Sequence, residues 1–449
     1  MIKSKYHQYE TDEHASNDLR LVVAGMCLLT CLLFALTICI DIQAEQGRIA
    51  IPGWVSVGNI DDARALIGAI IGSVSTVLGL VFSVVLLVLS MASGQFGPRL
   101  LRRFTLEHTG QGTIGLFSGT FLFSLFTLVA MHVENGHAFV PQITLLVAVI
   151  LMIVSFGALI LFSQSIRKGI QVGNLIANVT RDMSHAINTY IGVIDAREKN
   201  YTRIVPAEEH QALHVRCIHE GFPVLANLSG YLQQIKNTRL LSDASENDVV
   251  IALAVRPGHF IIANTIIAYV LPKEKGMLLM DRINESFSIG PNRTLTHDPA
   301  FALAQIVEIG IRALSPAIND TFTGLTCIDW LSSNILSLVE IPDDLSSWQD
   351  HNGFIRLIET PIQFSKLISG AFDMMRESGS GIPPVLMRLL QNFIQIGPHL
   401  KNNMQRMAIR RQVIAIKECI DLQSFTITDL NELQSAYENA MAALEGTST

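Results

Sequence analysis

The chain has 449 residues, too many for one domain, and only 16% of them are charged. Its mean hydropathy of +0.38 is typical of a membrane protein that also carries a water-soluble part. The net charge is only -7 and no basic block occurs, which argues against a nucleic-acid partner. Six cysteines without C-x-x-C spacing argue against a disulfide framework.

Four apolar runs predict four membrane-spanning helices. Residues 1–18 are polar and predict an N-terminal tail. The first run, 21–40, holds about twenty apolar residues, enough for one crossing. It starts far from Met1 and lacks a small-residue cleavage site, so we do not expect a signal peptide. The other runs begin at Ala65, Thr113 and Phe139, which places the transmembrane domain at 19–166.

The second run is the longest. From Ala65 to Pro98 it has no charged residue over about 34 residues, or about 50 Å of helix at ~1.5 Å per residue. The hydrocarbon core needs only about 30 Å. We therefore expect this helix to continue beyond the membrane before Pro98 ends it.

A stripe of small residues follows this second helix at spacings of three and four. Small side chains allow another helix backbone to approach closely in a membrane. The alternative is that copies of the helix surround an axis and their serine hydroxyls line a narrow pore. The two interpretations are compatible. The stripe is Gly68, Gly72, Ser75, Gly79, Ser83, Leu86, Ser90, Ser93 and Gly97, and only Leu86 is bulky.

Basic residues predict the orientation. Three arginines follow the second run and more basic residues follow the fourth, whereas the loop 41–64 is mainly acidic. Both termini are therefore expected in the cytoplasm. The segment 96–104 predicts an amphipathic membrane-interface elbow that anchors the second helix or transmits membrane tension. Its interface residues are Phe96, Arg99, Arg102 and Arg103.

The sequence after the fourth apolar run predicts a connecting segment, a small β domain and a mainly helical domain. Helical periodicity up to residue 196 and a charged stretch after it predict a connecting helix and linker at 167–220. Short alternating runs around the turn Pro257-Gly258 predict a small β-barrel-like domain at 221–290, with a strand at 283–289. The fold class is thus four transmembrane helices followed by a cytoplasmic α+β region.

Residues 291–449 predict a mainly helical domain. Asp298 followed by Pro299 predicts the start of a helix, and Ser315-Pro316 repeats that signal before a helix at 317–338. A strand is expected near 353–358. Further helices are expected at 361–377, 383–396, 402–420 and, capped by Thr428, 429–445.

Two polar clusters are candidates for chemistry. Ser315, Asn319 and Asp320 fit a helix cap and first turn, or alternatively a polar junction or ligand contact. His210 and His214 share a helix face as two zinc ligands would, but the flanking residues do not give a settled zinc spacing. Phosphate-binding loops and hydrolase motifs are absent from the sequence. We expect no enzymatic activity, metal or cofactor.

The stretches Met91 to Arg99 and Ala313 to Asp320 resemble a family of bacterial membrane proteins, domain of unknown function family 2254. Gly230-Tyr231-Leu232-Gln233 and Arg256-Pro257-Gly258 are similar to further signatures of that family. The family usually has Gly in place of Ala317 and Pro in place of Thr321. The resemblance implies a multi-pass inner-membrane protein without assigned biochemistry.

Together these patterns favour a homo-oligomeric channel for a small ion or solute, with a cytoplasmic domain for assembly and gating. Its candidate pore-lining or packing residues are Gly72, Ser75, Gly79, Ser83, Leu86 and Ser90. No charged residue lies in mid-span, which argues against a proton relay. The alternative is a membrane-tethered sensor or scaffold. A transporter is the third hypothesis, without visible half-repeats to support it.

Overall fold

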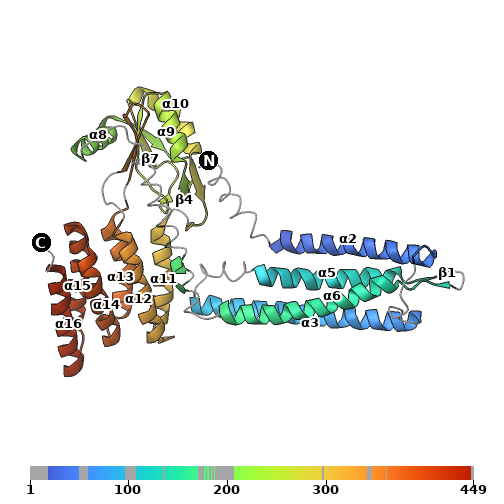
Figure 1. The fold of residues 1–449 in the computed structure, drawn as a ribbon. Helices are drawn as coiled ribbons and strands as arrows, with labels where there is room; N and C mark the ends of the chain where they lie inside the picture. The colour runs from blue at the N-terminus through green and yellow to red at the C-terminus, as the bar shows by residue number, and fades with distance from the viewer. Residues whose placement is uncertain are drawn as a thin grey trace. The chain divides into compact units, whose positions relative to one another are not determined.

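The computed structural model shows the chain as two compact units, Met1–Asn174 and Leu175–Thr449 (Figure 1). It describes residues 19–49, 59–96, 108–134, 137–169, scattered positions between 176 and 187, 207–295, 298–340, 346–360 and 362–445. Each unit is described below by itself.

Four long apolar helices form the first unit and run side by side (Figure 1). All four are long and apolar enough to cross a membrane, which confirms the four predicted apolar helices as candidate spans. A two-stranded antiparallel ribbon, β1 (Val133–Glu134) and β2 (His137–Ala138), lies between the third and the fourth of these helices in the chain. The helices are α2 (Leu19–Glu45), α3 (Ile60–Phe96), α5 (His108–Ala130) and α6 (Gln142–Gly169).

Helix α5 is the centre of this unit because it packs against α2, α3 and α6. Half of its apolar window is buried, against 11% to 22% for the other three helices. Gly115 and Gly119 bring α5 close to α2: a Cβ added at these positions would lie 2.5 Å from Met26 Sδ and 2.8 Å from Thr30. These glycines form a G-x-x-x-G motif, the usual signature of close helix packing in membranes. Our sequence analysis missed it.

The variant Gly119→Leu should therefore destabilise the first unit, because its side chain overlaps Thr30 of α2. Overpacking of this kind costs about 1–3 kcal/mol. Thermal unfolding of the detergent-solubilised protein measures the loss. Gly157→Leu on α6 is the matched control, since an added Cβ there meets nothing within 4 Å. An equal loss from both variants would contradict close packing at Gly119.

A buried carboxylate joins the ends of two helices in the same unit. Asp41, near the end of α2, is only 3% exposed. Its oxygens accept hydrogen bonds from the backbone N–H groups of Ile143 and Thr144, both at 2.9 Å, and from Thr144 Oγ1 at 2.6 Å. Asp41 thus caps α6, where the positive end of the helix dipole favours an anion.

The second unit contains two open sheets, with strand orders β3-β7-β5-β10-β9 and β6-β4-β8. The predicted β-barrel-like unit is therefore wrong: among the described residues neither sheet closes. The reason is that β10 pairs in parallel with β5 and widens the sheet, although it lies about a hundred residues further along the chain. The strands are β3 (Phe222–Leu225), β4 (Gly230–Ile235), β5 (Val250–Leu253), β6 (Phe260–Ile261), β7 (Ile266–Leu271), β8 (Phe287–Gly290), β9 (Ser346–Gln349) and β10 (Ile355–Glu359).

Three helices accompany these sheets: α8 (Ala207–Glu220), α9 (Asn237–Glu246) and α10 (Gly276–Glu285), with a 3-10 turn η2 at Lys273–Lys275. The strand predicted at 283–289 is wrong over its first part, because α10 continues to Glu285 and β8 begins at Phe287. Leu279 and Ile283 are buried one turn apart, so they belong to a helix face.

Six helices form the rest of the second unit and lie side by side (Figure 1). The predicted helices after residue 361 are confirmed, with small shifts at their ends. Asp298 caps the first, as predicted, by accepting from the N–H of Phe301. The last is capped by Thr426 and not by Thr428. The helices are α11 (Pro299–Ala313), α12 (Thr321–Leu338), α13 (Phe364–Ser378), α14 (Pro383–Ile396), α15 (Asn403–Leu422) and α16 (Ile427–Glu445), with η3 (Gly397–His399) after α14.

Candidate functional site

The small-residue stripe of α3 faces away from its own helix bundle. Its six candidate pore-lining or packing positions, from Gly72 to Ser90, are all exposed. A Cβ added at Gly68, Gly72 or Gly79 would meet nothing within 4 Å. The bundle is instead contacted by the opposite face, where Ile67, Ile70 and Val74 are buried. Within the part of the chain that the structure describes, the stripe from Gly68 to Ser90 therefore packs against no other helix.

Two hydroxyl groups on this exposed face donate hydrogen bonds within the helix. Thr76 Oγ1 donates to the carbonyl of Gly72 at 2.8 Å, and Ser83 Oγ donates to that of Gly79 at 3.0 Å. These bonds satisfy the hydroxyl hydrogens and leave oxygen lone pairs to face a partner helix or water. Of the membrane-interface elbow, Phe96 ends α3, whereas Arg99, Arg102 and Arg103 lie outside the described residues.

The polar cluster Ser315, Asn319 and Asp320 forms the corner between α11 and α12. Asp320 is the N-cap: its carboxylate accepts from Thr323 N at 3.1 Å and from Thr323 Oγ1 at 2.6 Å. The helix start predicted at 317 is therefore wrong, since α12 begins at Thr321. Ser315 Oγ donates backwards to the carbonyl of Arg312, and Asn319 has a positive φ of 50°. The cluster shapes a turn.

The turn Arg256-Pro257-Gly258 packs against the cap of α11. Asp298 forms an ion pair with Arg293 at 2.6 Å while capping the helix, and it is 4% exposed. A Cβ on Gly258, which has a φ of +91°, would lie 2.2 Å from Asp298 Oδ2. Burial raises the pKa of Asp298, and Arg293 opposes that shift. The close contact between Gly258 and Asp298 thus joins this turn of the β region to the N-terminus of α11, the first helix of the helical region.

His210 and His214 lie on α8. His210 Nε2 is 2.8 Å from Ser347 Oγ of β9. Cys217 is buried, and burial raises its pKa to about 11. Burial also lowers the pKa of His214. Within the described ranges no group of three or more His, Cys, Asp or Glu could hold a metal ion.

An open cleft of about 550 Å³ lies where α8 meets the ends of β5, β7 and β10. Its apolar wall includes Leu213, Val250 and Leu271. This cleft was not predicted from the sequence, because its residues come from distant parts of the chain and form no motif. The charged lining residues are Arg216, Glu220, Asp248, Lys273, Glu274 and Arg356.

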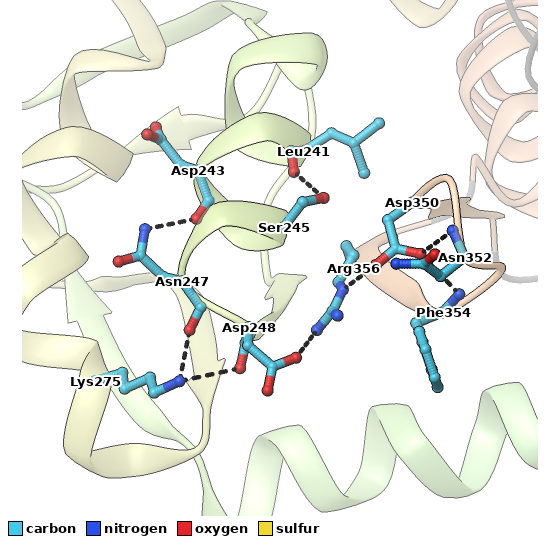
Figure 2. Close-up of polar contacts among 10 residues, drawn as sticks. All are labelled: Leu241, Asp243, Ser245, Asn247, Asp248, Lys275, Asp350, Asn352, Phe354 and Arg356. Carbon is cyan, nitrogen blue, oxygen red and sulfur yellow. Dashed lines mark hydrogen bonds and ion pairs between the residues drawn. The ribbon is translucent and has the colours of Figure 1, made fainter.

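Arg356 is the most enclosed charge of the cleft, with 12% of its side chain exposed. Figure 2 shows it between two carboxylates: Nε contacts Asp350 Oδ2 and Nη1 contacts Asp248 Oδ1, both at 2.7 Å. Asp350 also accepts from the N–H groups of Asn352 and Phe354. Burial opposes ionisation of both Asp350 and Arg356, but their hydrogen bonds outweigh it, so the pKa of Asp350 is lowered and that of Arg356 is raised.

Four helices long and apolar enough to cross a membrane, followed by a mixed α+β unit, are the architecture of a multi-pass membrane protein. The chain belongs to the family described as predicted membrane protein DUF2254, whose model matches residues 16–395. It is 28% identical over 368 residues to uncharacterized proteins of Mycobacterium tuberculosis and Mycobacterium bovis, covering 80% of this chain and 68% of each relative. No solved structure matches.

Proposed function

We propose that the protein is a homo-oligomeric channel of the bacterial inner membrane, with both termini and the second unit in the cytoplasm. One observation carries this proposal: the stripe positions of α3 from Gly72 to Ser90 are exposed, and no described residue lies within 4 Å of a Cβ added at Gly72 or Gly79. Close approach of backbones through Gly72 and Gly79 would bring copies of α3 around an axis. The proposal includes no catalytic activity.

Leu86 is the proposed gate. It is the bulky member of the stripe, and its side chain is 66% exposed. A ring of leucines in a narrow pore excludes water, and a tilt of the helices would widen the ring. The serines at 75, 83 and 90 would then provide the polar lining for a small ion or solute.

The test compares ion flux into liposomes for the parent and two variants. Leu86→Ser should raise flux about tenfold if the leucine ring contributes ~1.4 kcal/mol to the barrier. Gly79→Leu should abolish flux and the oligomer without unfolding the chain, because its own bundle leaves that position free. Ile153→Ser on the exposed face of α6 is the control and should leave flux unchanged. Equal flux from parent and Leu86→Ser would remove Leu86 as the gate, and a monomeric parent would overturn the channel.

The second candidate function is a membrane-tethered sensor or scaffold without transport activity. The cleft beside Arg356 favours it, because ligand sites are commonly concave with an apolar wall and a few polar groups. In that case the stripe serves only oligomerisation. Absence of flux from the parent and from Leu86→Ser, with an intact oligomer, would support this candidate.

A further inference from the structure

We propose that the cleft beside Arg356 binds a small organic anion, a phosphate or carboxylate group on an apolar body. In this proposal the carboxylate of Asp248 pairs with Arg356 when no ligand is bound, and the ligand's anionic group replaces it there. It names a ligand class for the second candidate function, and it holds whether or not the membrane helices conduct.

The two carboxylates bound to Arg356 differ in how firmly they are held. Asp350 is 7% exposed at its side chain and receives three hydrogen bonds, from Arg356 and from two backbone N–H groups. It is part of the folded framework. Asp248 is 79% exposed at its side chain, and Arg356 is the partner the structure shows for its carboxylate. An incoming anion can therefore replace Asp248 while Asp350 stays in place.

Cations for such an anion lie on the cleft's other walls. Arg216 comes from α8 and Lys273 from the turn η2 after β7, so with Arg356 of β10 three chain segments each contribute a cation to the lining. The planar guanidinium groups suit the paired oxygens of phosphate and carboxylate. Glu220 also lines the cleft, but it is exposed and pairs with Arg216 at 3.5 Å, a contact that is easily rearranged. Glu274 is likewise exposed.

The ligand's body is inferred from the apolar lining. The apolar lining consists of Leu213, Val250, Leu271 and Pro272, which inorganic phosphate has no apolar group to cover. Burial of apolar area adds affinity in proportion to the area removed from water. A cleft of about 550 Å³ accommodates a ring or short chain beside the anionic group.

The test is calorimetric titration of the full chain in detergent at low salt, with phenyl phosphate, benzoate and inorganic phosphate as probes. We expect phenyl phosphate or benzoate to bind at least about fivefold more tightly than inorganic phosphate. Asp248→Asn should tighten binding about threefold to tenfold, because it removes the internal competitor. Asp281→Asn on α10, an exposed position with the same change of charge, should have no effect.

Lys273→Gln and Arg216→Gln should each weaken binding several-fold, and as exposed positions they leave the fold intact. A soluble short-chain phosphatidic acid, titrated in parallel, distinguishes the source of the anion. Tighter binding of phosphatidic acid than of phenyl phosphate or benzoate indicates a lipid headgroup as the ligand. Tighter binding of phenyl phosphate or benzoate indicates a free metabolite. The proposal is overturned if no probe binds, if Asp248→Asn does no more than Asp281→Asn, or if both cleft cation variants retain parental affinity.

Discussion

Asp41→Asn should lower the free energy of unfolding of the first unit by about 3 kcal/mol. The substitution preserves size but replaces one carboxylate oxygen with an NH₂ group. That group cannot accept from the N–H of Ile143 or Thr144, so one buried backbone donor at the start of α6 loses its partner. An unpaired buried donor costs about 1–3 kcal/mol. Loss of the anion at the helix N-terminus adds up to ~2 kcal/mol.

Thermal or SDS-induced unfolding of the detergent-solubilised protein measures this loss. Glu45→Gln is the control because Glu45 lies one turn further along α2 and is exposed. It makes the same change of charge without touching α6, so its stability should match the parent. If Asp41→Asn unfolds at the same temperature or SDS concentration as the parent, the carboxylate does not hold the two helix ends together.

The elements that sequence reasoning predicted well are those determined by local signals. Four apolar runs long enough to cross a membrane gave four helices of sufficient length and apolarity to span it. Asp298-Pro299 gave the start of α11. A cap residue and a proline at the first helical position each act within a few residues of chain.

The errors arose where local signals compete or where contacts join distant segments. Ser315-Pro316 and Asp320 both carry a helix-start signal, and the structure uses Asp320. The pairing of β10 with β5 and the assembly of the cleft depend on contacts across a hundred residues or more, which no short pattern encodes. The exposure of the α3 stripe likewise depends on which face of α3 packs against α5, and that contact joins separate segments of the chain.

Gly258→Ala should destabilise the second unit by at least about 3 kcal/mol. The added Cβ would lie 2.2 Å from Asp298 Oδ2, so the carboxylate has to move from both Arg293 and the N-terminus of α11. Breaking a buried ion pair costs several kcal/mol, and loss of a cap about 1 kcal/mol. A positive φ costs an L-residue a further ~1–2 kcal/mol.

Gly370→Ala is the control, and its expected effect on stability is opposite in sign to that of Gly258→Ala. Gly370 lies within α13, is exposed, and a Cβ there meets nothing within 4 Å. Alanine is the better helix former, so this variant should stabilise the protein by up to ~1 kcal/mol. Urea unfolding followed by circular dichroism compares both glycine variants with the parent. Destabilisation by Gly370→Ala would show that the method detects something other than local packing.

A double-mutant cycle separates the two causes of the expected loss at Gly258. In an Asp298→Ala background the carboxylate is absent, so Gly258→Ala meets no obstacle there and should cost only the ~1–2 kcal/mol of its positive φ. The difference between the two backgrounds measures the contact between the Arg256-Pro257-Gly258 turn and the α11 cap. An equal cost in both backgrounds would mean that backbone strain alone requires glycine, and that the turn does not depend on Asp298 for its position.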